Sequence, residues 1–182
     1  MNIVLNIDDI VEDNQLNRQK LFFSDKKRNM IMDGEFTKLI FSDELITLNG
    51  LYLKCPLYTQ PVDKFQKKNM IWFQPYHVNN SSLIQNFCSL ERELLEYYKY
   101  YTQTKKSASF ILHNQLYSGN AKIYRPPSDD ANDANVNHII KISGIWESED
   151  RFGVTYKFQG TQGTQGTYGS PNPSLSGNLL LR

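Results

Sequence analysis

The chain has 182 residues, of which 20 are Lys or Arg, 19 are Asp or Glu and 13% are aromatic. This length suits one domain with extensions and is too short for two comfortable domains. The near-zero net charge excludes a global field that would drive the chain to nucleic acid or to a membrane surface. Any contact with a polyanion must therefore come from a local patch.

The cysteines, the histidines and the first residues of the chain indicate which cofactors and which cellular compartment to expect. Cys55 and Cys88 lie far apart, and together with three histidines they give no zinc spacing. No metal or other cofactor is therefore expected. The opening acquires carboxylates within its first nine residues, which argues against a cleavable leader, and no apolar run approaches the ~20 residues of a membrane helix. We expect a protein that is neither secreted nor transmembrane, inside a cell or inside a particle.

Residues 1–32 form a separate compositional zone. Apolar residues such as Ile3, Leu5 and Ile10 precede a charged patch at residues 25–28. This apolar content is too high for a purely solvated tail, so the zone is interpreted as an N-terminal arm. The sequence leaves open whether the arm docks on its own domain or on a partner.

Three strands are predicted in the next part of the chain. Residues 35–41 read EFTKLIF and alternate as a strand does. Residues 45–54 read LITLNGLYLK, in which an Asn-Gly pair is the strongest short hairpin signal. This run is either two short strands or one long strand bent at Gly50, and we favour the bend. The third strand is NMIWF at residues 69–73.

An amphipathic helix of about 20 residues is predicted from Ser81 onward, because Leu83, Phe87, Leu90 and Leu94 recur at three- and four-residue spacing. Ser81 or Ser82 is the expected N-cap. Residues 110–112 are a short strand or a connector, and GNAKIYR at residues 119–125 is a fourth strand.

A β-hairpin is predicted at residues 139–158, where two runs rich in β-branched and aromatic residues flank a polar turn. In its second strand Phe152, Val154, Tyr156 and Phe158 alternate with other residues, so one face is expected to be buried. Gly144 suggests a bulge. Residues 33–158 thus form the domain, and residues 159–182, rich in Gly, Gln and Thr, form a flexible tail.

The order of elements predicts a mainly β fold. A helix between the third and fourth of five to six antiparallel strands is the arrangement of the OB-fold, a small, partly open β-barrel. The alternative is an α+β arrangement, an antiparallel sheet with one helix laid across its face.

Three stretches carry a resemblance to a known group of proteins: FTKLIFSDELITLNGLYL at residues 36–53, the GNAKIYR run, and IIKISGIWESEDRFGVTYKF at residues 139–158. Together they resemble small proteins encoded by nucleocytoplasmic large DNA viruses. Element order and aromatic content are also similar to the OB-fold single-stranded DNA-binding proteins of such viruses and some phages. That resemblance implies a location in the host cytoplasm, in a viral factory or in the virion. The chain departs from those proteins in lacking an acidic tail.

The residues indicate binding and not catalysis. The histidines are isolated, and there is no phosphate-binding glycine loop. Single-strand binders stack bases on aromatic rings and guide the backbone with Lys and Arg. Basic residues recur on nearly every predicted strand, beside rings such as Phe73, and Lys67 and Lys68 lie in a preceding loop. The candidate nucleic-acid-binding residues are Lys38, Tyr52, Lys54, Trp72, Lys122, Tyr124, Arg125, Lys141, Trp146, Tyr156 and Lys157.

Two functions therefore remain from the sequence. One is a non-catalytic single-stranded DNA-binding protein of a large DNA virus. The other is a virion structural or assembly protein whose residues 1–32 and 159–182 bind neighbouring viral subunits.

Overall fold

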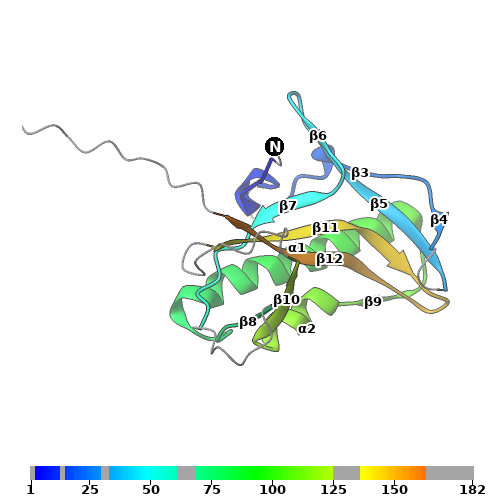
Figure 1. Cartoon of the computed structure of the whole chain (residues 1–182). Helices are drawn as coiled ribbons and strands as arrows, with labels where there is room; N and C mark the ends of the chain where they lie inside the picture. Colours follow the sequence, from blue (N-terminus) through cyan, green and yellow to red (C-terminus); the bar gives the residue numbers. More distant parts are fainter. Residues whose placement is uncertain (1–2, 13–14, 30–32, 61–68, 125–135, 163–182) are drawn as a thin grey trace, which may run out of the picture.

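The computed structural model describes residues 3–12, 15–29, 33–60, 69–124 and 136–162 (Figure 1). Its elements in chain order are η1 (Ile7–Asp9), β1 (Val11–Glu12), β2 (Gln15–Leu16), η2 (Arg18–Lys20), β3 (Leu21–Phe23), β4 (Lys27–Arg28), β5 (Glu35–Ser42), β6 (Thr47–Leu48), β7 (Leu51–Lys54), β8 (Met70–Trp72), α1 (Val78–Thr102), β9 (Ser107–Ser109), α2 (Ile111–Tyr117), β10 (Asn120–Tyr124), β11 (Val136–Glu147) and β12 (Arg151–Gln162).

The hairpin of β11 and β12 forms the centre of the main sheet. β12 pairs in parallel with β9 near its start and with β10 near its end, and β8 adds to β10 in antiparallel orientation. β11 pairs with β7 along its first half and with β5 along its second half, both antiparallel. The sheet is therefore mixed, with β3 at one end of the strand order and β8 at the other.

The sheet divides where β11 changes partners. Register shifts between Ile142 and Gly144, as the predicted bulge requires, and β7 pairs before this point while β5 pairs after it. Gly50 has φ +101°, and a Cβ atom there would lie 2.5 Å from the Ile142 carbonyl oxygen. Only glycine fits such a position. The favoured single bent strand was wrong, because β6 and β7 are two short strands with different partners.

The N-terminal segment packs on its own domain. Leu5 forms a parallel bridge with Leu53, and β3 pairs with β5. Ile10 is fully buried, as Leu21 nearly is, and both belong to the one hydrophobic core. The sequence left open whether this arm docks on its own domain or on a partner. The described residues 3–12 and 15–29 dock on their own domain.

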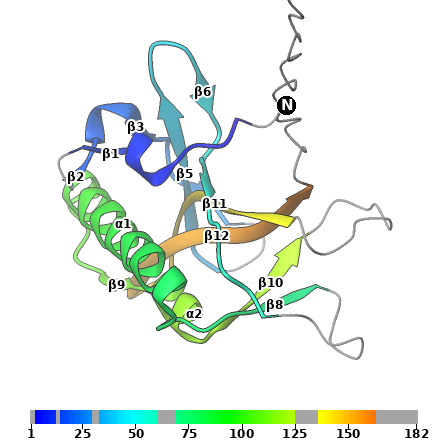
Figure 2. The ribbon, with the colours of Figure 1, turned by 90° about the vertical axis from the view of Figure 1, so that its left-hand side faces the viewer.

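Both helices lie on the same side of the sheet. In Figure 1, β11 and β12 pass in front of α1, and Figure 2 shows the two strands beside α1 after a quarter turn. The helical stripe buries Ile84, Phe87 and Leu94 against the core. The N-cap is His77, whose Nδ1 accepts the Asn79 amide at 3.2 Å, so the predicted serine caps were wrong. Residues 110–112 begin a second helix, α2, where a strand or connector was expected.

The barrel expected from the order of elements does not form. The two ends of the strand order, β3 and β8, are not paired with each other, so the sheet stays open. The β-rich α+β class is confirmed, but with a mixed sheet and two helices in the described part of the chain, not an antiparallel sheet with one. Local patterns predicted strands but could not specify which distant edges pair.

Candidate functional site

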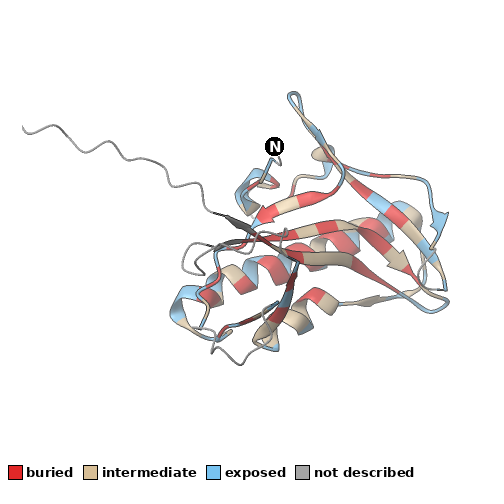
Figure 3. Cartoon of the chain, viewed as in Figure 1, coloured by how far each residue is buried: buried red, intermediate tan, exposed pale blue. Residues whose placement is uncertain are grey.

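Strand register assigns each side chain of the sheet to one of two faces, because directly paired residues point to the same side. Ile140 pairs with Phe158 and Ile145 with Val154, and all four belong to the buried core beneath the helices. The intervening residues therefore point away from the helices. We call this second side the open face, and Figure 3 shows buried positions alternating with more exposed ones along its strands.

Two rings lie over glycines at one end of the open face. Trp146 pairs with Gly153 on one side and Phe36 on the other. A Cβ atom on Gly153 would lie 2.9 Å from the indole of Trp146, and one on Gly144 would lie 2.7 Å from the Phe36 ring. The two glycines therefore let the rings lie close to the backbone, where both remain half-buried.

A second group of open-face residues lies at the middle of the hairpin. Lys141 pairs with Lys157 on β12 and with Tyr52 on β7, so the three side chains stand in a row across three strands. The ammonium group of Lys141 lies 4.5 Å from the centre of the Tyr52 ring, a cation–π contact. Lys54, two residues after Tyr52 on β7, is exposed on the same face.

A third group lies on β10 and β8. Tyr124 pairs with Gln159 and is 54% exposed, and Trp72 pairs with Asn120 and is 38% exposed. Lys122 lies between them in the pairing pattern, with its ammonium group 5.5 Å from the centre of the Tyr124 ring. Large exposed rings next to cations are chemically suited to stacking.

The charged side chains at the described paired positions of the open face are all cationic. Within the paired positions of the main sheet that the structure describes, no Asp or Glu points to this face, since Glu35 and Glu147 pair directly with each other on the helix side. Arg151 is also on this face, but it lies 3.4 Å from Asp150 in the adjoining turn. The lysines are Lys27, Lys38, Lys54, Lys122, Lys141 and Lys157.

The structure brings together nine of the eleven residues predicted from sequence. Tyr156 is not among them, because it points toward the helices, where its hydroxyl donates to the Ile111 carbonyl at 3.3 Å. Burial raises its pKa to about 12. Phe73 is 3% exposed and belongs to the core, while Arg125, like Lys67 and Lys68, lies outside the described residues. The nine are Lys38, Tyr52, Lys54, Trp72, Lys122, Tyr124, Lys141, Trp146 and Lys157.

Sequence reasoning missed Phe36, Gly144 and Gly153 as parts of this surface. The sequence could have predicted Phe36, because it lies two residues before Lys38 in an alternating strand and so shares its face. The role of the glycines depends on which ring lies across from each, and that follows only from the register.

A buried ionic cluster lies on the other side of the sheet, at the end of α1. The Glu147 side chain is 1% exposed and accepts contacts from Lys26 at 2.6 Å, Lys106 at 2.8 Å and the Tyr98 hydroxyl. Burial alone would raise the pKa of Glu147, but these donors outweigh it and lower the pKa to about 2. Burial, and then the hydrogen bond to Glu147, raise the pKa of Tyr98. Through these contacts Glu147 links β11 to α1 by Tyr98, to the N-terminal segment by Lys26, and to the chain before β9 by Lys106.

Glu91 is a second buried carboxylate with a structural role. Its two oxygens accept the amides of Leu112 at 2.9 Å and His113 at 2.7 Å, the first turn of α2. Burial raises the pKa of Glu91, partly offset by these bonds. Because amides at a helix N-terminus need acceptors, this contact fixes α2 on α1.

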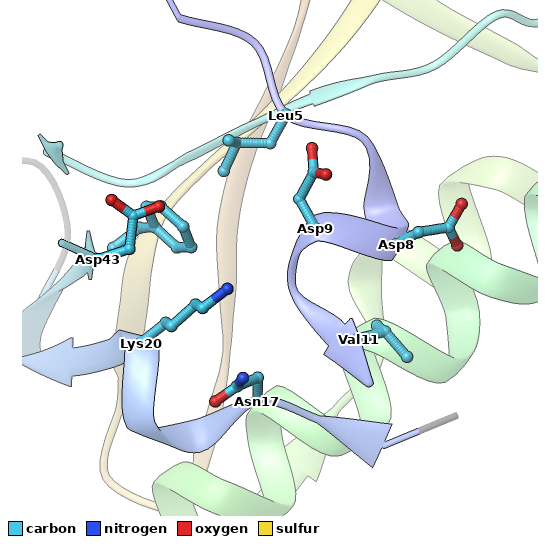
Figure 4. Close-up of a pocket in the computed structure, with 8 residues that line it drawn as sticks. Leu5, Asp8, Asp9, Val11, Asn17, Lys20 and Asp43 are labelled. Atoms are coloured by element: carbon cyan, nitrogen blue, oxygen red, sulfur yellow. The ribbon is translucent and has the colours of Figure 1, made fainter. Parts of the chain in front are cut away.

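A hollow of about 400 Å³ lies between the N-terminal segment and the turn after β5 (Figure 4). Two of its three carboxylates, those of Asp9 and Asp43, already have partners in the chain. Asp9 accepts the Asn6 amide at 2.6 Å, and Asp43 accepts the amides of Leu45 and Ile46 at 2.9 Å. These backbone bonds, together with Lys20, lower the pKa of Asp43. Asp9 and Asp43 thus serve a helix cap and a turn.

Comparison of the chain with models of protein families, with curated proteins and with solved structures finds no match. Among the described residues, no cluster of His, Cys, Asp or Glu is arranged to hold a metal ion. No described helix has the length and apolar character required to cross a membrane. Function therefore has to be argued from the open face itself.

Proposed function

We propose that this protein binds single-stranded DNA on the open face of its sheet, without catalysing a reaction. The observation that carries the proposal is the strand register, which gathers rings and lysines from six strands, β5, β7, β8, β10, β11 and β12, on one face with no carboxylate at the described paired positions.

The chemistry of the open face suits bases and phosphates together. A base stacked on an aromatic ring contributes about 1–3 kcal/mol, and Trp146, Tyr124 and Trp72 each expose part of a ring. None of the open-face lysines on β5, β7, β10, β11 or β12 lies within an ion pair among the described residues. Their ammonium groups are therefore available to phosphates.

The rings favour a single strand over a duplex. Bases in a duplex already stack on one another, whereas an unpaired strand can present base faces to protein rings. Duplex DNA would contact the lysines alone, so we expect it to bind more weakly.

The direct test is binding of a labelled oligothymidylate to the purified protein, followed by fluorescence anisotropy. If each of the five open-face lysines on β5, β7, β10, β11 and β12 neutralises at most one phosphate, the slope of log K against log salt is about −2 to −3.5. A duplex of equal length serves as the comparison. Absence of binding at about 10 μM protein and 50 mM salt would overturn the proposal, and equal binding of the duplex would remove the stacking role of the rings.

The viral setting of this proposal rests on the motif resemblance described above. The alternative, a virion assembly protein, rests on terminal extensions that bind neighbouring subunits. In the described part of the N-terminal segment, Leu5, Ile10, Leu16 and Leu21 are committed to the chain's own core. This favours binding by the sheet over binding by that arm. Stoichiometric protein in purified particles, without affinity for oligonucleotide, would favour assembly instead.

A further inference from the structure

The pairing of Lys141 with Lys157 is unusual within the sheet. The two lysines are directly opposite on adjacent strands, where like charges repel and a pair of opposite charges would stabilise the hairpin. No Asp or Glu occupies a neighbouring open-face position on the strands that flank them in the described structure. Tyr52, Ile139 and Thr155 surround them instead.

Both lysines are held partly against the sheet. Each is of intermediate exposure, unlike the exposed Lys38, Lys54 and Lys122. The Tyr52 ring lies 4.5 Å from the Lys141 ammonium group and limits where it can point. Since Cβ atoms of directly opposite residues are about 5 Å apart, two lysine ammonium groups can converge on one small anion between the strands.

We infer that Lys141 and Lys157 form a subsite for one phosphate of the bound strand, with the Tyr52 ring holding Lys141 in place. This inference rests on the proposed function and names the point on the open face where the backbone is anchored. The phosphodiester supplies the negative charge that no neighbouring Asp or Glu of the described sheet provides. Binding therefore reduces the repulsion between the two lysines. Arginine-like bidentate geometry is not required, because each ammonium group acts as a point charge.

The location of the subsite divides the open face into two stacking regions. Along β12, Lys157 lies four positions after Gly153, the residue beneath Trp146, which corresponds to ~13 Å at ~3.3 Å per residue. Tyr124 pairs with Gln159, two residues beyond Lys157. A strand anchored at Lys141 and Lys157 thus has Trp146 on one side and Tyr124 on the other.

The test compares Lys141→Gln and Lys157→Gln with Lys99→Gln, a matched loss of one charge at an exposed position of α1, on the other side of the sheet. Affinity for labelled oligothymidylate is measured over a range of salt concentrations. Each open-face variant is expected to bind about tenfold more weakly at low salt. Each is also expected to flatten the salt slope by about 0.7, the contribution of one phosphate on a single strand. Lys99→Gln should retain wild-type affinity and slope.

Thermal unfolding of the free proteins provides a second readout. Lys157→Gln removes the repulsion without removing the Tyr52 contact, so its Tm is expected to equal that of the wild type or to rise by about 1–4 °C. A folded variant that binds with wild-type affinity and slope would overturn the phosphate subsite while leaving the proposed function intact. Weakening by Lys99→Gln equal to that of the open-face variants would also overturn it, since charge alone would then explain the loss. Failure of the wild type to bind would instead refute the proposed function.

Discussion

At the level of single residues, the rings of the open face differ in how much of the fold depends on them. Trp72 lies on the edge strand β8 and is 38% exposed, whereas Trp146 lies on β11, an inner strand of the sheet, and is packed over Gly153. A role in binding can therefore be separated from a role in folding most cleanly at Trp72.

Replacing Trp72 by Ala is expected to weaken binding of single-stranded DNA by about 5- to 100-fold, the equivalent of one stacked base. Because the ring is at an edge, the free energy of unfolding should change little more than for a surface substitution, roughly 0.5 kcal/mol. Anisotropy and urea unfolding measure the two quantities. Tyr76→Ala is the matched control, since Tyr76 is 83% exposed and lies in the turn before α1. Equal weakening by both variants would argue against a stacking site at Trp72.

Glu147 makes the stability of the protein depend on acid pH. Its pKa in the folded protein is about 2, below the ordinary 4.5, so its carboxylate stabilises the fold fully above about pH 4.5. This contribution, about 3 kcal/mol, should be lost progressively as the pH falls from about 4.5 to 2. Urea unfolding across this range should show the loss in the wild type but not in Glu147→Gln.

Glu147→Gln should also be destabilised at neutral pH, by about 3–5 kcal/mol, because Lys26 and Lys106 then lose their buried counter-charge. Glu35→Gln is the control. Glu35 is exposed and lies 3.7 Å from Lys26, so its loss should matter far less. Similar stability of the two variants at neutral pH would show that the cluster does not fasten the fold.

At the level of elements, β11 changes its partner from β7 to β5 close to Gly50, and this contact depends most strictly on the residue type. Gly50→Ala combines a positive φ with a Cβ atom 2.5 Å from the Ile142 carbonyl, so one strand must shift. We expect a loss of about 2 kcal/mol or more in the free energy of unfolding. The exposed neighbour Asn49, changed to Ala, should cause a much smaller loss. Thermal denaturation distinguishes them, and unchanged Tm in Gly50→Ala would contradict the close approach of the two strands.

The predicted face assignments held wherever they depended on alternation within one strand. Lys157 alternates with Tyr156 and Phe158 of the predicted buried row, and the register pairs it with Lys141 on the open face. The same rule assigned Tyr156 to the buried row with Val154, and including it among the stacking rings ignored that rule. Parallel pairing of β10 with β12 joins residues distant in the chain, so no local pattern could have predicted it.

At the level of the whole molecule, the N-terminal segment belongs to the same cooperative unit as the sheet. Ile10 is fully buried in the core, whereas Ile3 is 42% exposed. Ile10→Ala is expected to lower the free energy of unfolding by about 2–5 kcal/mol, and Ile3→Ala by much less. Urea unfolding measures both. If Ile10→Ala unfolds at the wild-type urea concentration, the segment is a dispensable arm and the assembly alternative regains its support.

β11 and β12 form the middle of the main sheet and follow their partner strands in the chain. β5, β7, β9 and β10 all precede this hairpin in the chain, and each pairs with one of its two strands. A growing polypeptide on the ribosome therefore carries unpaired strand edges until residues 136–162 emerge. Such non-local pairing slows folding and leaves the nascent chain open to aggregation, so the native sheet cannot form before β12 has left the ribosome.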